Sequence, residues 1–273
     1  MNSGVEKITI FPGFDKFGER EKFGRLEIAR GEIVSIVGPT GAGKSQLLYD
    51  IEKLAQGDTK SKRKVLINNV SPGKKWKSDP RRKIVASLSQ SMDFLTDTSV
   101  GEFLDMHLKA RGRETEASLI KEVIDEANEI TGEPISAKMN LLSLSGGQSR
   151  ALMVSDIANI TVSPIILIDE IENAGIKKSK ALQILIEEEK IVLIVTHDPS
   201  LALSADKRLV VENGGIVRVL DTAPQEKDIA HYLNWIEEHN LRIREKVRQG
   251  EVVEEPGIYC VEPTKFRNIE LKN

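Results

Sequence analysis

One stretch decides how this chain folds: Gly38-Pro39-Thr40-Gly41-Ala42-Gly43-Lys44-Ser45. It has the form G-x-x-x-x-G-K-[ST], follows the apolar run at 33–37 and precedes a helix-like stretch, which is the strand–loop–helix context of a phosphate-binding loop. Backbone N–H groups of such a Gly-rich turn cradle phosphate oxygens at a helix N-terminus. Lys44 adds a cation for the β- and γ-phosphates, and Ser45 offers a hydroxyl to Mg²⁺. Alone, the stretch predicts a nucleoside triphosphate site and nothing narrower.

Four further motifs follow this loop along the chain. They are Ser87-Leu88-Ser89-Gln90, Leu144-Ser145-Gly146-Gly147-Gln148, Ile165-Ile166-Leu167-Ile168-Asp169-Glu170 and Val195-Thr196-His197-Asp198. Taken singly, an Asp-Glu pair or a histidine after a strand is typical of structural positions. The order of all five motifs together favours a functional role for these residues over a structural one. Over residues 5–220 the chain resembles an ATP-binding cassette (ABC) ATPase.

The resemblance implies a role for each polar residue of these motifs. Ser45 and Asp169 would hold Mg²⁺, and Gln90 would complete the contacts to the metal and the water. Glu170 would be the general base for the attacking water, and His197 would hydrogen-bond the γ-phosphate. Hydrolysis of ATP needs charge neutralisation and an aligned water, and this set supplies both.

The signature stretch Ser145-Gly146-Gly147-Gln148 adds a requirement for a second subunit. In ABC ATPases these residues face the nucleotide of the other cassette. One chain with one signature therefore implies two composite sites in a head-to-tail dimer, formed with a second copy or a homologous cassette.

Adenine in this family usually stacks on an aromatic residue from the N-terminal strands. Phe11, Phe14, Phe17 and Phe23 lie in the plausible zone, and we select Phe14. The alternative is that most of the four pack on the sheet or loop.

Composition limits the class of protein and its compartment. The chain has 273 residues, 40% of them apolar and 30% charged, with a net charge of −3, which allows a buried core and carries no global basic signature. The single cysteine, Cys260, fits a reducing compartment. No 18-residue apolar run or signal pattern is present. We therefore expect a cytoplasmic protein with no membrane span of its own.

The alternation of apolar runs and helical patterns predicts an α/β fold. Together with the resemblance, it indicates a P-loop NTPase of ABC type: a mainly parallel sheet, an antiparallel β layer and a helical subdomain at about 100–145 with the signature at its end. We expect an ATPase domain at 1–220 and a C-terminal extension at 221–273. Within that extension, 225–248 is predicted to be one long helix that packs on its own domain or serves a partner or dimer surface. Residues 257–273 receive no assignment.

Two features depart from the family pattern. Arg150 follows Gln148 after one residue, where the common pattern has two and a second glutamine. Ile171 stands where a proline normally follows the catalytic glutamate, and the loop at 171–175 is unlike the usual Ser-Ala-Leu-Asp type. These changes leave phosphate and metal binding intact but fall on the segment that communicates across the dimer.

Residues 60–83 form a strongly basic segment. They hold ten Lys or Arg residues against one acid, Asp79, with Trp76 among them. The segment is either a solvated edge of the antiparallel layer, since charged edges block unwanted strand pairing, or a docking patch for nucleic acid, an acidic protein or a lipid surface.

Three biological roles fit an ABC-type Mg²⁺-dependent ATPase. The leading one is the motor subunit of a transport complex whose membrane subunit is a separate chain. A soluble ATPase that remodels or matures a protein partner is the first alternative. A nucleic-acid-associated ATPase is the second, supported only by the basic segment, and we expect no nucleic-acid partner.

Overall fold

The structure is a computed structural model that describes residues 4–73, 76, 84–89, 92–161, 163–170, 176–187 and 189–253. Several features singled out in the sequence lie outside these residues. They are Gln90, the loop at 171–175, most of the basic segment between 74 and 83, Cys260 and the tail at 257–273.

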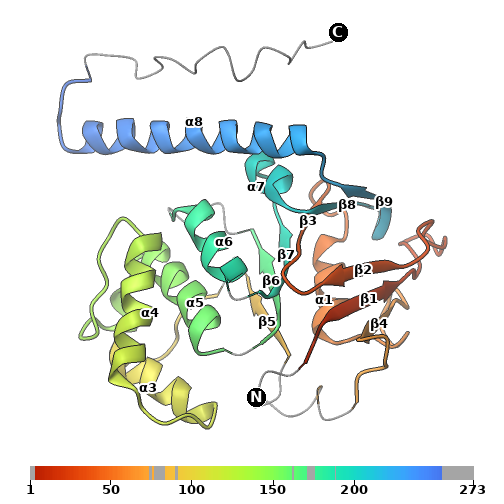
Figure 1. Ribbon diagram of the computed structural model, residues 1–273, viewed down its shortest axis with the longest axis horizontal. Coiled ribbons are helices and arrows are strands. Elements are labelled where there is room, and N and C mark those ends of the chain that lie inside the picture. The colour runs from red at the N-terminus through yellow and green to blue at the C-terminus, as the bar shows by residue number, and fades with distance from the viewer. Residues whose placement is uncertain are drawn as a thin grey trace. The chain divides into compact units, whose positions relative to one another are not determined.

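A six-stranded sheet forms the centre of the ATPase unit (Figure 1). Its order is β5-β6-β7-β3-β8-β9. The first five strands are parallel, and β9 is antiparallel to β8. The strands are β5 (Val85–Leu88), β6 (Ile165–Asp169), β7 (Ile191–Val195), β3 (Ile33–Val37), β8 (Lys207–Glu212) and β9 (Gly215–Asp221). The mainly parallel sheet predicted from the sequence is confirmed.

Both faces of strands β5, β6, β7 and β3 are buried, as expected for parallel strands covered on both sides. Alternate residues of β6 point to opposite faces. Ile166 and Ile168 join one hydrophobic cluster, which includes the helical subdomain. Ile165 and Leu167 join another, which includes helix α1 (Lys44–Glu52). The continuous apolar runs that predicted these strands therefore follow from burial on both sides.

A second, antiparallel sheet of three strands covers the outer side of α1 (Figure 1). Its order is β2-β1-β4, with β1 at Lys7–Phe11, β2 at Leu26–Ala29 and β4 at Lys64–Ile67. Helix α1 contacts β4 on one side and β5 and β6 on the other. The expected antiparallel layer is therefore present.

The helical subdomain contains α3 (Val100–Ala110) and α4 (Ala117–Ile130), followed by the short 3-10 turn η2 (Leu141–Ser143) and α5 (Gly146–Asn159). Ser99 starts α3 with a capping box, because its hydroxyl accepts from the N–H of Glu102 and the Glu102 carboxylate accepts from the N–H of Ser99. Helix α5 packs on α4 and on α6 (Lys178–Glu187), and α7 (Pro199–Ser204) packs on β3. The predicted helical subdomain is confirmed.

The long C-terminal helix is α8 (Pro224–Arg248). Contacts divide the chain into two compact units, Met1–Ala230 and His231–Asn273. The first turn of α8 is tied to the start of β8, since Glu226 accepts from Arg208 at 2.7 Å and Lys227 donates to Asp206 at 2.9 Å. Within the second unit, the rings of Tyr232, Trp235 and His239 stack in succession along the helix. The 220/221 boundary and the role of the extension stay predictions.

The basic segment does not behave as one surface. Lys64 is exposed on β4, which is an edge strand, and so fits the solvated edge. Arg63 is completely buried, so the expectation of a solvated edge is wrong at this residue. Trp76 packs against a core cluster. Arg63 is inside because two buried carboxylates, those of Glu21 and Asp50, accept its hydrogen bonds.

Candidate active site

The strand order brings three motifs to one edge of the sheet. The phosphate-binding loop follows β3, Asp169 and Glu170 close β6, and His197 follows β7. Strands β6, β7 and β3 are adjacent and parallel. Because the carboxyl ends of parallel strands meet at the same edge, residues more than 100 positions apart become neighbours there.

Two glycines let the phosphate-binding loop take its shape. Gly43 has φ of 98°, a left-handed conformation that only glycine adopts without strain. A Cβ on Gly43 would lie 2.6 Å from the Cα of Gly214, and one on Gly38 would lie 2.2 Å from the carbonyl oxygen of Val211. The loop is therefore packed directly against the β8–β9 hairpin.

Lys44 is held inside this loop. Its Nζ donates to the carbonyl oxygens of Gly38 at 2.8 Å and Pro39 at 3.2 Å, and it lies 3.2 Å from Nε2 of His197. The residue is only 6% exposed. The ammonium group thus lies between the loop and the histidine, where the phosphates of a nucleotide would replace these contacts.

Glu170 and His197 complete the cluster. The Oε1 of Glu170 is 3.3 Å from Nε2 of His197. Glu170 has φ of 52°, a conformation that costs a non-glycine residue about 1–3 kcal/mol. Its N–H donates to the carbonyl of Val195 at 3.0 Å. Backbone and neighbouring strand together direct the carboxylate toward the histidine.

Asp198 fixes the segment that carries His197. One carboxylate oxygen accepts from the N–H and hydroxyl of Ser200 at 2.8 and 2.7 Å, and the other accepts from Lys178 at 2.6 Å. Burial acts to raise the pKa of Asp198, but these hydrogen bonds and the charge of Lys178 outweigh it and lower the pKa below its ordinary value. Sequence reasoning did not identify Lys178, because it lies twenty residues from Asp198 and belongs to no motif.

The oxygen donors expected for Mg²⁺ lie on the elements of this edge. Ser45 is in the first turn of α1, and Asp169 ends β6 beside Val195 of β7. A hydroxyl and a carboxylate are hard oxygen ligands, which is the donor type that Mg²⁺ prefers together with phosphate oxygens. The donor set therefore fits the metal.

The signature residues form the start of helix α5. The Ser145 hydroxyl accepts from the N–H of Gln148 at 3.2 Å, and Oε1 of Gln148 accepts from the N–H of Ser145 at 2.9 Å, so the two residues form a capping box. Ser145 and Gly146 are exposed, whereas Gln148 is buried and its Nε2 donates to the carbonyl of Pro134. Within its own chain, Gln148 therefore positions the start of α5.

Phe14 lies on a turn next to the phosphate-binding loop. The residue is 39% exposed, and the ammonium of Lys62 lies 5.7 Å from the centroid of its ring. In the same turn, Nζ of Lys16 donates to the carbonyl of Gly41 at 2.5 Å, which ties the turn to the loop. Phe17, also on this turn, is 77% exposed. Of the other candidates, Phe23 packs against the core.

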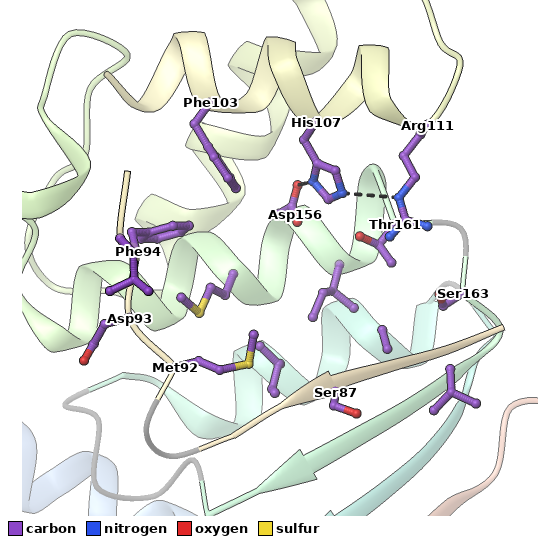
Figure 2. Close-up of a pocket in the computed structure, with 16 residues that line it drawn as sticks. Ser87, Met92, Asp93, Phe94, Phe103, His107, Arg111, Asp156, Thr161 and Ser163 are labelled. Carbon is purple, nitrogen blue, oxygen red and sulfur yellow. Dashed lines mark hydrogen bonds and ion pairs between the residues drawn. The ribbon is translucent and has the colours of Figure 1, made fainter. Parts of the chain in front are cut away.

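A groove of about 400 Å³ opens between β5 and the helical subdomain (Figure 2). Apolar side chains line most of it, including Phe94 and Phe103, whose rings meet edge to face at 5.0 Å. One end is polar: Nδ1 of His107 is 2.7 Å from Asp156, and Nε of Arg111 donates to Nε2 of His107 at 3.2 Å. No signal in the sequence pointed to this groove, because its residues come from three separate segments.

The chain matches a known family and has similar curated relatives. The family model for ABC transporters matches residues 24–173. An uncharacterized ABC transporter ATP-binding protein of Methanocaldococcus jannaschii is 52% identical over 247 residues, which cover 90% of this chain and 94% of that one. A spermidine/putrescine import ATP-binding protein of Legionella pneumophila is 28% identical over 206 residues, 72% of this chain and 53% of that protein.

Solved structures give the same fold. A dimeric bacterial ABC transporter cassette superposes with a TM-score of 0.62 at 25% identity, covering 79% of this chain and 99% of that one. A dimeric cassette in a post-hydrolysis state with ADP and phosphate superposes with a TM-score of 0.60 at 24% identity, over 79% and 99% of the two chains.

The fold and the site define an ATP-binding cassette. The chain belongs to the ABC transporter family and is an ABC-type ATPase. Among the residues that the structure describes, no helix has both the length and the apolar character needed to cross a membrane.

Proposed function

We propose that this chain is the ATP-hydrolysing motor subunit of a transport complex whose membrane-spanning subunit is a separate polypeptide. One observation carries the proposal: at one edge of the sheet, Nε2 of His197 lies 3.2 Å from Nζ of Lys44 and 3.3 Å from Oε1 of Glu170. In a chain of the ABC transporter family, that cluster is equipped for phosphate binding and for activation of water. In a cell, the chain would act at the cytoplasmic face of a membrane through its partner.

The side chains divide the work of hydrolysis. Lys44 and the loop N–H groups neutralise and orient the phosphates, Glu170 accepts a proton from the attacking water, and His197 donates toward the γ-phosphate. Ser45 and Asp169 would hold Mg²⁺, with Gln90 near it. When bound, the ion would neutralise charge on the phosphate oxygens. His197 is 46% exposed and Glu170 27%, so the site is open to nucleotide and water.

We propose further that two copies dimerise around ATP. Ser145 and Gly146 are exposed at the N-terminus of α5, where backbone N–H groups and the helix dipole favour an anion. Two solved structures with this fold are dimeric cassettes. A γ-phosphate held by one copy would then be contacted by Ser145 and Gly147 of the other.

The groove beside β5 is our proposed contact for the membrane subunit. Its long apolar lining with a polar end at His107, Asp156 and Arg111 suits one amphipathic helix. Strand β5 lines the groove and ends at Leu88, two residues before Gln90 in the sequence. Movement of a bound helix could therefore reach the active site through a single strand.

Two variants test the ATPase assignment. Lys44→Ala should lose ATP binding, whereas Glu170→Gln should bind ATP and turn over about 10²–10⁴-fold more slowly. Glu189→Gln is the matched control, because Glu189 is an exposed residue whose partner is Arg30. Phosphate release measures turnover. Activity of Glu170→Gln within about threefold of wild type would eliminate Glu170 as the base.

The partner is identified with the Glu170→Gln protein held in its ATP-bound form. Affinity purification from detergent-solubilised cells should recover a polypeptide with several membrane spans. Recovery of a soluble protein alone would instead support the remodelling role. For the nucleic-acid role, sub-micromolar binding at physiological salt that weakens in Lys74→Glu/Lys75→Glu would be needed, and we expect none because the chain is net acidic.

A further inference from the structure

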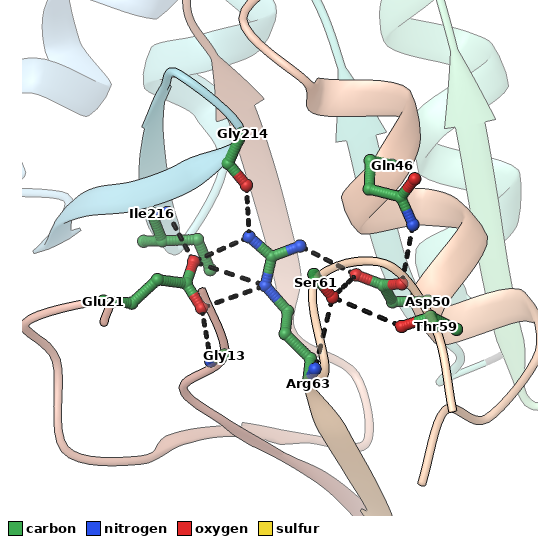
Figure 3. Close-up of polar contacts among 9 residues, drawn as sticks. All are labelled: Gly13, Glu21, Gln46, Asp50, Thr59, Ser61, Arg63, Gly214 and Ile216. Carbon is green, nitrogen blue, oxygen red and sulfur yellow. Dashed lines mark hydrogen bonds and ion pairs between the residues drawn. The ribbon is translucent and has the colours of Figure 1, made fainter. Parts of the chain in front are cut away.

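Arg63 lies buried between two carboxylates (Figure 3). Its Nη2 donates to Glu21 at 2.6 Å and its Nη1 to Asp50 at 2.8 Å, while Nε donates to both Glu21 oxygens at 3.2 and 3.1 Å. Burial acts to lower the pKa of Arg63, but the hydrogen bonds and charges of Glu21 and Asp50 outweigh it and raise that pKa. The guanidinium is therefore a permanent cation.

The two carboxylates connect Arg63 to separate parts of the fold. Asp50 lies on α1, the helix that begins with Lys44, and it also accepts from Gln46 at 2.9 Å and Ser61 at 2.7 Å. Glu21 accepts from the N–H of Gly13 at 2.7 Å and from the N–H of Ile216 at 2.6 Å. Removal of the guanidinium would thus break the link between the Asp50 carboxylate on α1 and the Glu21 carboxylate, which holds the N-terminal turn and the β8–β9 hairpin.

The fifth contact of Arg63 leads to the phosphate-binding loop. Its Nη2 donates to the carbonyl of Gly214 at 2.7 Å. The N–H of Gly214 in turn donates to the carbonyl of Ala42 at 2.6 Å, and Gly214 packs against Gly43 without room for a side chain. Arg63 therefore supports the loop through one residue, Gly214, and supports its helix through another, Asp50.

Stability alone is a weak reason for such a cluster. Burying three charged groups carries a desolvation penalty, and well-packed apolar residues often stabilise a fold as much or more. What a planar guanidinium with five donors provides is fixed geometry between the groups it bonds. Here those groups are the two supports of the phosphate-binding loop.

We infer that Arg63 is a positioning residue of the nucleotide site: by bonding Gly214 and Asp50 at once, it holds the Gly38–Ser45 loop ready for the triphosphate. The inference rests on the proposed nucleotide site. Loss of the arrangement would weaken ATP and ADP alike, because the loop contacts phosphates that both nucleotides have. Loss of Arg63 should therefore lower nucleotide affinity, whereas loss of Glu170 should lower turnover.

The test compares Arg63→Lys with a matched control. An ammonium keeps the charge but has only three donors, all on one atom, so it cannot reproduce the five hydrogen bonds that the guanidinium makes to Asp50, Glu21 and Gly214. Leu104→Ala, in a fully buried position of the helical subdomain, supplies a comparable loss of melting temperature away from the loop. Titration with a fluorescent ATP analogue, at a temperature where circular dichroism shows all proteins folded, should give an affinity lower on the order of tenfold for Arg63→Lys. Leu104→Ala should match the wild type.

Hydrogen exchange supplies a second readout. In Arg63→Lys the amides of 38–45 should exchange faster, while those of the buried strand β7 stay protected. If Arg63→Lys does not fold, Glu21→Gln is tested in the same way, with the same expectation. Unchanged nucleotide affinity and unchanged hydrogen exchange in the variant would overturn the inference about Arg63. Lys44→Ala shows whether the proposed nucleotide site itself is wrong. If that site is wrong, Lys44→Ala also keeps the wild-type affinity; if only the inference is wrong, Lys44→Ala loses it.

Discussion

Removal of the Ser145 hydroxyl should distinguish its role as the N-cap of α5 from its proposed contact with the γ-phosphate of the opposite copy. Within its own chain, the hydroxyl accepts one hydrogen bond, from the N–H of Gln148 at 3.2 Å. Loss of a helix N-cap of this kind costs about 1 kcal/mol. For a folded unit of this size, 1 kcal/mol shifts the melting temperature by roughly 2–4 °C. Ser145→Ala should therefore melt only slightly below wild type when no nucleotide is present.

Gln148→Ala supplies the comparison. It removes two side-chain hydrogen bonds, one from the N–H of Ser145 and one to the carbonyl of Pro134, and it empties a buried position. At about 1 kcal/mol for each bond, the loss is roughly 2 kcal/mol, or about 4–8 °C. By melting temperature, Gln148→Ala should be the more damaging of the two.

Dimer formation should rank the two variants in the opposite order. In the Glu170→Gln background, we expect Ser145→Ala to lose a hydrogen bond to the γ-phosphate of the opposite copy. A hydrogen bond to a charged group contributes about 1.5–3 kcal/mol, which is roughly 10- to 150-fold in the ATP concentration for half-maximal dimer. Light scattering over an ATP titration measures this. If dimer loss instead follows the melting temperatures, with Gln148→Ala the worse, Ser145 makes no contact across the interface.

Two further predictions concern base recognition and pH. Phe14→Ala should raise KM for ATP about tenfold with kcat unchanged, since stacking of a base on an aromatic ring contributes about 1–3 kcal/mol. Phe17→Ala is the control and should leave KM unchanged. The reverse result would assign the stacking to Phe17. Lys178→Met should destabilise the fold near neutral pH by about 1.5–3 kcal/mol, because the mostly buried ammonium donates to Asp198 at 2.6 Å. The folded-state pKa of Asp198 lies below its ordinary value of 3.8. The stabilisation by the Lys178–Asp198 pair is therefore complete at pH values above 3.8, and it disappears as the pH falls through the lower folded-state pKa. Urea unfolding of both proteins at several pH values should show the difference narrowing only in acid, and a constant difference would contradict the role given to the Asp198 charge.

The sequence by itself determined the chemistry of the site and most of the fold. A phosphate-binding loop is recognisable at Gly38–Ser45 because its function depends on local backbone shape and on the residue types that allow it. The strands were predictable for a related reason: burial on both faces of a parallel sheet requires continuous apolar runs, and Ile165–Ile168 and Ile191–Val195 are such runs.

Tertiary structure alone decided which of these residues meet. The contacts among Lys44, Glu170 and His197 depend on the order β6-β7-β3, and strand order is a long-range property that no local pattern specifies. The same holds for Arg63, which belongs to a basic run in the sequence and yet is buried, since its partners Glu21 and Asp50 are 42 and 13 residues away. A buried charge is stable only where the fold supplies partners for it, so its position follows from packing and could not be read from the residues around it.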